Sequence, residues 1–211
     1  MMRVALSGGI ASGKTMVSNI IAGYGVPIID TDVLAREVVV PGSIGLQRIV
    51  DRFGKSVLDE DNVLDRKKLR GIVFSDDDAR RDLESILHPL IRELTNLKLD
   101  ELEQQDTLYA VVVIPLLVET GQHKSYDHVV IVDVEPAIQI KRLMARDNCS
   151  QEQARKILDS QASRKERLAV ADDLILNSST KKAVELQVGK VHDHLTALAK
   201  RKKKKPNQKP D

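Results

Sequence analysis

The sequence has very few aromatic residues. Its 211 residues include two Phe, three Tyr and no Trp, so the hydrophobic fraction of 42% is almost entirely aliphatic. A chain of this length can bury a substantial core, which must then be built from Val, Leu, Ile and Ala. The scarcity of aromatics also argues against proteins that bind single-stranded nucleic acid by stacking its bases.

Cysteine and long apolar runs are also nearly absent. The single cysteine, Cys149, excludes an internal disulfide and suits a reducing compartment, and we interpret it as an ordinary thiol. No apolar run reaches about 18 residues and no basic-then-apolar leader is present. We therefore expect a soluble, cytoplasmic protein without a membrane partner.

The net charge of +2 hides an uneven distribution. Residues 200–211 contain seven of the 33 basic residues and one of the 31 acidic residues, so the rest of the chain has a net charge near −4. The basic character thus belongs to the C-terminal segment. We predict a disordered tail there and no specific nucleic-acid partner.

The most informative segment is residues 8–15, Gly-Gly-Ile-Ala-Ser-Gly-Lys-Thr, which fits the phosphate-binding pattern G-x-x-x-x-G-K-[ST]. An apolar strand (3–7) precedes it and residues at helical spacing (16–21) follow, as a P-loop requires. Backbone N–H groups of such a loop bind phosphate, the Lys14 ammonium reaches the β- and γ-phosphates, and the Thr15 hydroxyl can ligate Mg²⁺. The sequence therefore predicts nucleotide binding.

Two carboxylates follow the next predicted strand, residues 26–29. Asp30 and Asp32 would lie at the carboxyl end of that strand, where open parallel sheets bind ligands. We predict that Asp32 faces a substrate. The alternative is that these aspartates cap the helix predicted over 33–40, because Asp is a preferred N-cap residue.

Residues 43–106 show helical rather than strand patterns. Asp65 and Ser75 are predicted N-caps, and leucines and isoleucines then recur at helical spacing up to Leu97. Pro89 is expected to interrupt the helix unless it lies in the first turn of a new one. An insertion of this length is too long for a simple crossover, so we predict a helical subdomain for the second substrate. His88, within it, is either a structural histidine or a ligand.

Three further strands are predicted over residues 108–113, 129–133 and 173–177, with a final helix over 181–200. Asp133 ends the second of them and is either a Walker-B-like magnesium ligand or an ordinary strand-end residue. Helices are predicted over 136–146 and, after a Ser150 cap, up to residue 158. The alternation of strands and helices predicts an α/β fold.

Basic residues gather between the last two predicted strands. Arg142 and Arg146 lie four residues apart on one predicted helix, and Arg164, Lys165 and Arg167 follow. Phosphoryl transfer requires cations around the transferred group, and a mobile basic lid would supply them. The alternative is a solvated helical face, although arginine is the better phosphate ligand.

The order of these signatures resembles that of the bacterial dephospho-coenzyme A kinases over residues 2–198. The resemblance rests on the P-loop and on six further segments. These segments are Asp-Thr-Asp-Val-Leu-Ala-Arg at 30–36, Leu-His-Pro at 87–89, Pro-Leu-Leu-Val-Glu at 115–119, Arg-Leu-Met-Ala-Arg-Asp at 142–147, Gln-Ala-Ser-Arg at 161–164 and Ala-Asp-Asp at 171–173.

The resemblance implies a P-loop NTPase fold of three α/β/α layers with a five-stranded parallel sheet. The implied domains are a nucleotide-binding core (1–31, 107–141 and 170–199), a helical dephospho-CoA-binding domain (32–106), a lid (142–169) and a disordered basic tail (200–211). The implied reaction transfers the γ-phosphate of ATP to the ribose 3′-hydroxyl of dephospho-CoA, giving CoA and ADP. We expect a monomer, with weak oligomerisation as the alternative.

The resemblance also implies site residues. The catalytic residues would be Lys14, Asp32 and Arg142, and the lid arginines Arg164 and Arg167. Residues that bind ATP would be Gly9, Ala11, Ser12, Gly13, Lys14, Thr15, Met16, Arg142, Arg146 and Asn177. Residues that bind dephospho-CoA would be Asp32, Arg36, His88 and Leu116. Thr15 would hold Mg²⁺ through its hydroxyl.

One position departs from the family pattern. Many members carry an aspartate two residues before Pro-Leu-Leu, where this chain has Val113, so no carboxylate there can bind a metal. The alternative functions are a kinase for another small hydroxyl or phosphate acceptor and a nucleotide-driven switch on nucleic acid. The acidic body and the absence of an N-K-x-D guanine-reading motif argue against the switch.

Overall fold

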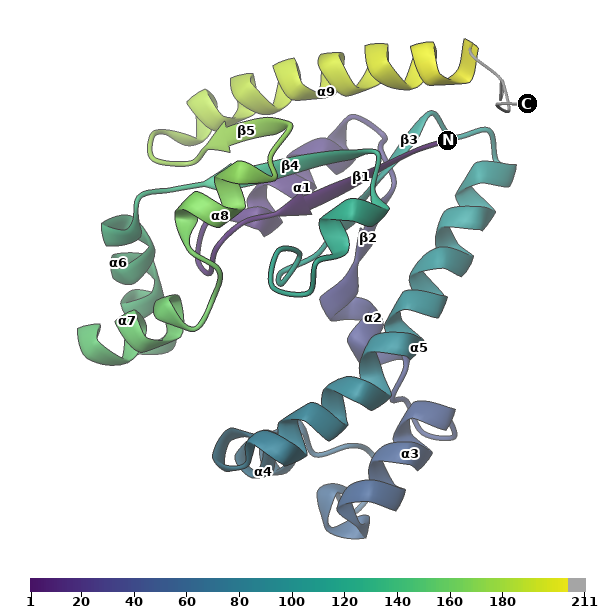
Figure 1. Cartoon of the computed structure of the whole chain (residues 1–211), viewed down its shortest axis with the longest axis vertical. Coiled ribbons are helices and arrows are strands. Elements are labelled where there is room, and N and C mark those ends of the chain that lie inside the picture. The colour runs from purple at the N-terminus through teal and green to yellow at the C-terminus, as the bar shows by residue number, and fades with distance from the viewer. Residues whose placement is uncertain (205–211) are drawn as a thin grey trace. The chain divides into compact units, whose positions relative to one another are not determined.

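The computed structural model describes residues 1–204, which form two compact units. The sheet unit contains residues 1–30 and the chain from Glu101 onward, and the helical unit contains residues 31–100. Figure 1 shows the elements of both units in chain order. None of the helices within residues 1–204 combines the length and the hydropathy that a membrane span requires.

The sheet unit is built on five parallel strands in the order β2-β3-β1-β4-β5. This confirms the predicted α/β fold with a five-stranded parallel sheet. The strands are β1 (Met2–Ser7), β2 (Ile28–Asp30), β3 (Tyr109–Val113), β4 (His128–Asp133) and β5 (Asp173–Leu176). All residues of β3 and β4 are buried, as expected for strands covered on both faces.

The strand register brings the carboxyl ends of the strands to one edge of the sheet. Leu6 of the central strand β1 is paired with Val113 of β3, and Ser7 with Ile131 of β4. The loop that follows β1 therefore lies between the ends of its two neighbours, where parallel sheets bind ligands. At this edge the Ser7 hydroxyl donates a hydrogen bond of 2.6 Å to the Ile114 carbonyl.

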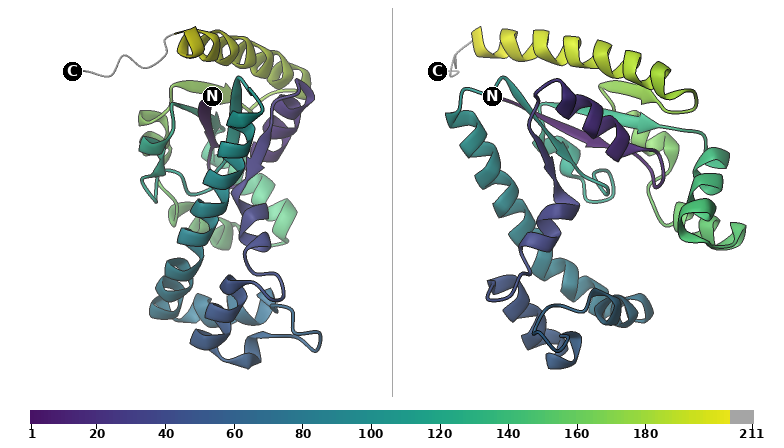
Figure 2. Two further views of the ribbon diagram at one scale, coloured as in Figure 1. Left: turned by 90° about the vertical axis from the view of Figure 1, so that its right-hand side faces the viewer. Right: turned by 180° about the vertical axis from the view of Figure 1, so that it is seen from behind.

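Helices cover the two faces of this sheet. Its helices are α1 (Lys14–Gly23), the 3₁₀ helix η2 (Gln122–Ser125), α6 (Pro136–Asp147), α7 (Gln151–Asp159), α8 (Arg164–Ala169) and α9 (Lys181–Lys204). Figures 1 and 2 show α1 and α8 on opposite sides of the sheet. The fully buried Val17 and Val188 show that α1 and α9 share one core, which also contains Val4 and Leu6 of β1.

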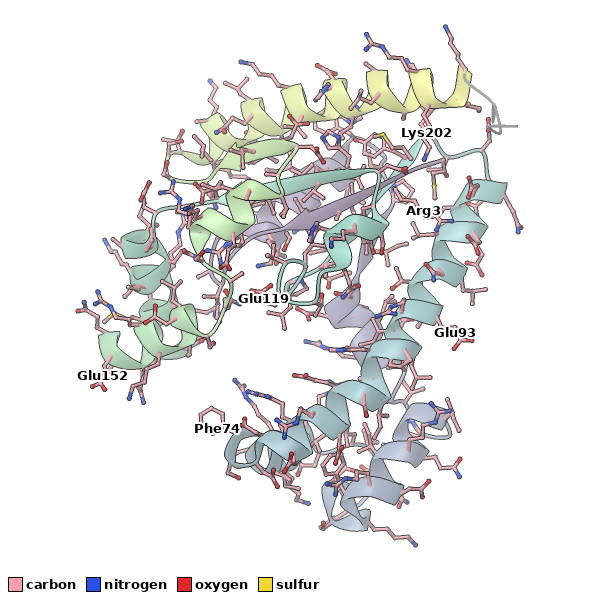
Figure 3. All side chains as sticks on the ribbon, viewed as in Figure 1. Arg3, Phe74, Glu93, Glu119, Glu152 and Lys202 are labelled. Atoms are coloured by element: carbon pink, nitrogen blue, oxygen red, sulfur yellow. The ribbon has the colours of Figure 1, made fainter. Side chains whose placement is uncertain are left out.

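The prediction that a disordered tail begins at residue 200 is wrong for residues 200–204, because α9 continues to Lys204. Two lysines of its last turn find carboxylate partners on the sheet unit: Lys202 Nζ lies 2.6 Å from Asp127 Oδ1, and Lys203 pairs with Asp106. Figure 3 shows Lys202 on the side of α9 that faces the sheet. The rest of the predicted tail, residues 205–211, lies outside the described residues.

The helical unit is built from α2 (Thr31–Glu37), α3 (Ile44–Phe53), the 3₁₀ helix η1 (Lys55–Val57), α4 (Arg66–Ser75) and most of α5 (Asp77–Gln104). Its core is a separate aliphatic cluster. The buried members are Val39, Leu46, Ile49, Val57, Leu64 and Leu69. The leucine stripe of α5 packs on this cluster through Leu83 and Leu87.

The predicted helix boundaries in this unit are partly correct. Asp65 caps α4, accepting hydrogen bonds from the backbone N–H groups of Lys67 and Lys68. Ser75 is not a cap, because the next residue, Asp76, accepts the corresponding bonds at the start of α5.

Pro89 does not interrupt α5. The proline removes the bond to the carbonyl four residues earlier, at Ser85, and both residues are exposed, so water can satisfy that carbonyl. The leucine stripe on the other side of the helix keeps it continuous.

The core that α1 and α9 share should stabilise the sheet unit, and two leucines of α9 test this. Leu195 on α9 is fully buried, whereas Leu186 on the same helix is 64% exposed. Leu195→Ala should lower the free energy of unfolding by about 2–5 kcal/mol, because it leaves a cavity in the core. Leu186→Ala, measured by the same denaturant titration, should change it by less than about 0.5 kcal/mol. Equal losses in the two variants would contradict the packing of α9.

Candidate active site

The loop between β1 and α1 has the backbone geometry of a phosphate-binding loop. Ala11 and Gly13 adopt left-handed conformations with φ of 55° and 95°. A Cβ on Gly8 would lie 2.4 Å from the Val132 carbonyl oxygen of β4, so only glycine fits there. The loop therefore curls tightly against the end of the neighbouring strand.

Lys14, the first residue of α1, folds back over this loop. Its ammonium donates hydrogen bonds to the carbonyls of Gly8 (2.8 Å) and Gly9 (3.1 Å). Thr15, in the first turn of α1, is exposed, and Met16 is partly buried against the core. The positively charged end of Lys14 is thus held over the loop, at the helix N-terminus that favours anions.

Three successive carbonyls of the loop are bonded to side chains from distant segments. Each acceptor receives one side-chain N–H, and the donors come from α6 and from the end of β5. The pairs are Gln139 Nε2 with Ile10 (2.7 Å), Arg142 Nη1 with Ala11 (3.4 Å) and Asn177 Nδ2 with Ser12 (2.7 Å). Because its carbonyls are bonded to the protein, the loop can present N–H groups to an anion.

The same donors are connected to one another. Arg142 Nη2 donates to the Asn177 carbonyl at 2.9 Å, and the Asn177 N–H donates to the Asp133 carbonyl at 2.8 Å. Asn177 is 4% exposed, so its side-chain amide is removed from water where it donates to Ser12. The ends of β4 and β5 and the helix α6 are thereby joined to the loop.

Arg164, at the start of α8, is bound by two carboxylates. Its Nη2 lies 2.7 Å from Asp133 Oδ2, and its Nη1 lies 2.9 Å from Glu135 Oε1. The hydrogen bond with the buried Asp133 carboxylate raises the pKa of Arg164, and the charges of both carboxylates act in the same direction. Asp133 thus lies at the end of β4 and is paired with an arginine.

Arg167, one turn later on α8, is nearly buried, with 7% of its surface exposed. It donates to the Ala162 carbonyl, and its Nη2 lies 2.9 Å from the point that a Cβ on Gly9 would occupy. Burial lowers the pKa of this guanidinium, whereas the nearby carboxylate of Glu119 raises it. An arginine remains protonated under these conditions, so a cation lies beside the first turn of the loop.

Two buried polar atoms beside the loop have no hydrogen-bond partner among the described residues. They are Ser12 Oγ and Gln139 Oε1. Buried polar atoms are rarely left unsatisfied, and such atoms at a candidate site indicate a missing ligand or water. Both atoms flank the loop that the sequence predicts to bind phosphate.

The sequence did not indicate the role of Gln139 or of Gln161, whose Oε1 accepts the Ile10 N–H at 2.8 Å. Glutamine in a predicted helix or loop normally faces solvent, so no local pattern distinguishes these two. Arg146, predicted to bind ATP, pairs with Asp147 at 2.7 Å.

The residues predicted to bind dephospho-CoA belong mostly to the helical unit. Asp32 and Arg36 are exposed in the first and last turns of α2, and His88 is exposed on α5. Because α2 begins at Thr31, the residue that precedes the helix is Asp30, and Asp32 lies inside the first turn. Leu116 belongs to the sheet unit, follows β3 and is 42% exposed.

Removing the hydrogen bond from Asn177 to the loop should lower the free energy of unfolding by a measurable amount. Asn177→Ala would leave the buried Ser12 carbonyl without its donor, so unfolding should become easier by about 1–3 kcal/mol. Ser178→Ala, an exposed neighbour, should leave the free energy of unfolding nearly unchanged. Chemical denaturation of the two variants measures both values, and a loss below about 0.5 kcal/mol for Asn177→Ala would exclude the bond as a structural tie.

Comparisons with known proteins identify the family to which this chain belongs. The family model described as dephospho-CoA kinase matches residues 2–183. The dephospho-CoA kinase of Vibrio parahaemolyticus is 44% identical over 203 residues, which are 96% of this chain and 98% of that protein. Among solved structures, TT1252 from Thermus thermophilus is similar to this chain with a TM-score of 0.76 and 25% identity. The dephospho-CoA kinase from Campylobacter jejuni is similar with a TM-score of 0.72 and 28% identity. Each comparison covers 92% of this chain and 97% of the other chain. The chain therefore belongs to the dephospho-CoA kinase family.

Proposed function

We propose that this protein transfers the γ-phosphate of ATP to the ribose 3′-hydroxyl of dephospho-CoA, giving CoA and ADP. The observation that carries the proposal is the loop of residues 8–15, whose Ile10, Ala11 and Ser12 carbonyls are bonded to the protein. A loop whose carbonyls are held in this way is shaped in advance for binding phosphates through its amides. Membership of the dephospho-CoA kinase family supplies the acceptor.

The phosphates of ATP would be bound by the loop and by Lys14. In the structure Lys14 donates to the carbonyls of Gly8 and Gly9, which are weaker acceptors than phosphate oxygens. The nucleotide would therefore draw the ammonium from these carbonyls to its own oxygens. The adenine would lie near residues 177–179, where Ser178 and Ser179 are exposed and the Asn177 amide already donates to Ser12.

Thr15 fits a Mg²⁺ ion, because its hydroxyl is exposed directly after Lys14 in the first turn of α1. Val113 offers no ligand, and the Asp133 carboxylate is paired with Arg164 in this structure. The protein would thus hold the ion through Thr15, together with the phosphates of ATP. When bound, Mg²⁺ would neutralise charge on the β- and γ-phosphates.

Two arginines already lie at the loop, and a third is held beside it by acids. Arg142 and Arg167 contact the loop or its immediate neighbours, whereas Arg164 is paired with Asp133 and Glu135. We infer that residues 142–169 act as a lid and that Arg164 exchanges these carboxylates for the transferring phosphate when it closes. A guanidinium that reaches the phosphate only at that stage stabilises the transition state more than it stabilises bound ATP.

The acceptor hydroxyl would be oriented by Asp32, with Arg36, His88 and Leu116 binding other parts of dephospho-CoA. Its carboxylate is exposed in the first turn of α2, directly after β2. A carboxylate can accept the proton that the 3′-hydroxyl loses as it attacks the γ-phosphate. The cytoplasmic location and the monomeric state stay predictions from the sequence.

The proposal is tested by incubating the protein with Mg-ATP and separate acceptors and measuring ADP release. Dephospho-CoA should raise ADP release far above the water-only background, whereas adenosine and other small hydroxyl compounds should not. The Lys14→Ala variant serves as the inactive control, because it removes the ammonium at the loop. A stronger response to another acceptor, or equal activity in the control, would overturn the proposed function.

Replacing Asp32 by Asn distinguishes a catalytic role of this residue from a role in helix stability. Asp32→Asn keeps the shape and removes the charge, so kcat should fall by about 10²–10³ while ATP affinity changes little. Asp51→Asn, which alters another exposed carboxylate of the helical unit, should leave kcat unchanged. Steady-state kinetics of both variants decide the point, and a loss of less than about tenfold for Asp32→Asn would assign the residue to helix stability instead.

Arg164→Ala tests the exchange of partners in the lid. Since Arg164 pairs with Asp133 and Glu135 before the nucleotide arrives, its loss should lower kcat by about 10²–10³ and change the KM for ATP much less. Lys182→Ala, at an exposed lysine in the first turn of α9 and outside the lid, should behave like the parent protein. An increase in the KM for ATP with an unchanged kcat would place Arg164 at the ground-state nucleotide.

A further inference from the structure

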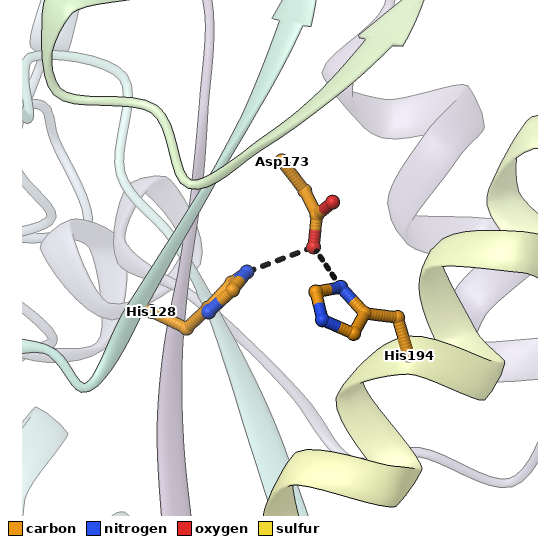
Figure 4. A group of neighbouring side chains, drawn as sticks. All are labelled: His128, Asp173 and His194. Atoms are coloured by element: carbon orange, nitrogen blue, oxygen red, sulfur yellow. Dashed lines mark hydrogen bonds and ion pairs between the residues drawn. The ribbon is translucent and has the colours of Figure 1, made fainter.

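Two histidines and an aspartate meet at the amino-terminal ends of β4 and β5, away from every residue that the proposed reaction uses. Figure 4 shows His128 and His194 directed at one oxygen of Asp173. His128 Nε2 and His194 Nδ1 each lie 2.8 Å from Asp173 Oδ2. The ligand atoms of the three side chains all lie within 4.8 Å of one another.

The backbone fixes two of these residues rigidly. His128 opens β4 and Asp173 opens β5, which is paired with β4 through Val130 and Asp173. Beside this pair, Asp172 exchanges two bonds with Val129: its N–H donates to the Val129 carbonyl at 2.9 Å, and its Oδ2 accepts the Val129 N–H at 2.8 Å. The spacing of His128 and Asp173 is therefore set by the sheet.

The third residue is delivered by α9. His194 lies between Val191 and Leu195, both buried in the core beneath the helix. The packing of α9 thus fixes the position from which the His194 ring reaches Asp173. Three elements that are far apart in sequence place their ligand atoms around one point, and such preorganisation is what a metal site requires.

We propose that His128, Asp173 and His194 bind a divalent transition-metal ion, with Zn²⁺ the best match. Two imidazole nitrogens and one carboxylate oxygen are a common protein ligand set for zinc, with water in the fourth position. His194 is half exposed, so water can reach that position. Ligand atoms around tetrahedral zinc are about 3.3 Å apart. The two 2.8 Å contacts to Asp173 would open slightly, and the two histidine nitrogens, which lie within 4.8 Å of each other, would adjust to the same separation.

Binding requires a lone pair on each of the two nitrogens that face Asp173. In the hydrogen-bonded state these nitrogens carry protons that they donate to the carboxylate. Each neutral ring can move its proton to the other nitrogen, so neither histidine has to gain or lose a net proton. The metal would then replace two hydrogen bonds with three coordinate bonds.

The role of this ion would be structural. Asp133, at the candidate active site, ends the strand that His128 begins, which places the two roughly 16 Å apart along β4. A metal held by β4, β5 and α9 would fasten the C-terminal helix to the edge of the sheet. It would also fix the start of β5, the strand that carries Asn177 at its other end.

Calorimetric titration with ZnCl₂ tests the proposal, using the full chain freed of metal by a chelator and dialysed, without nucleotide. The parent protein should bind one Zn²⁺ per chain. His194→Gln and Asp173→Asn should each weaken binding by more than about 100-fold, because a direct ligand contributes more than its supporting partners. His123→Ala removes a histidine outside the cluster and should bind like the parent.

Thermal unfolding gives a second readout on the same proteins. Zn²⁺ at about 100 times its Kd should raise the Tm of the parent and of His123→Ala by roughly 5–10 °C, and that of His194→Gln hardly at all. His194 is half exposed, so its variant is expected to fold, and circular dichroism verifies this. No Zn²⁺ binding by the parent, or equal binding by His194→Gln, would leave the cluster as a hydrogen-bonded network and overturn the proposal.

Discussion

The hydrogen bonds that tie the P-loop carbonyls to the rest of the sheet unit are the interactions on which the candidate site depends. A loop with left-handed conformations at Ala11 and Gly13 has many alternative shapes, and only its partners select one. Gln139 and Arg142 from α6 and Asn177 from the end of β5 supply these partners. The sheet, which aligns the ends of β1, β4 and β5 at one edge, makes their convergence possible.

The distribution of charge around this loop follows from the same arrangement. Lys14, Arg142 and Arg167 are held at the loop by carbonyls, while Arg164 is held by Asp133 and Glu135. Each cation therefore has an acceptor before any phosphate is present, which limits their mutual repulsion. Phosphate oxygens accept more strongly than carbonyls, so binding ATP would redirect existing cations rather than bring new ones.

Much of this architecture could be predicted from the sequence, because its signals are local. The P-loop pattern, the apolar strands and the Ser150 cap each depend on residues that are neighbours along the chain, and the structure confirms them. The contributions of Gln139 and Gln161 could not be predicted, because their partners are more than 120 residues away in the sequence. The continuation of α5 through Pro89 and of α9 to Lys204 likewise depends on tertiary packing and on ion pairs that local patterns do not contain.

The central claim is that this edge of the sheet supports phosphorylation of one hydroxyl of dephospho-CoA by ATP. Phosphorus NMR of the product formed with Mg-ATP and dephospho-CoA tests it most directly, because the spectrum identifies the oxygen that receives the phosphate. A new phosphomonoester is expected on the ribose 3′-oxygen, in an amount equal to the ADP formed. A phosphate on another oxygen, or ADP without a phosphorylated acceptor, would contradict it.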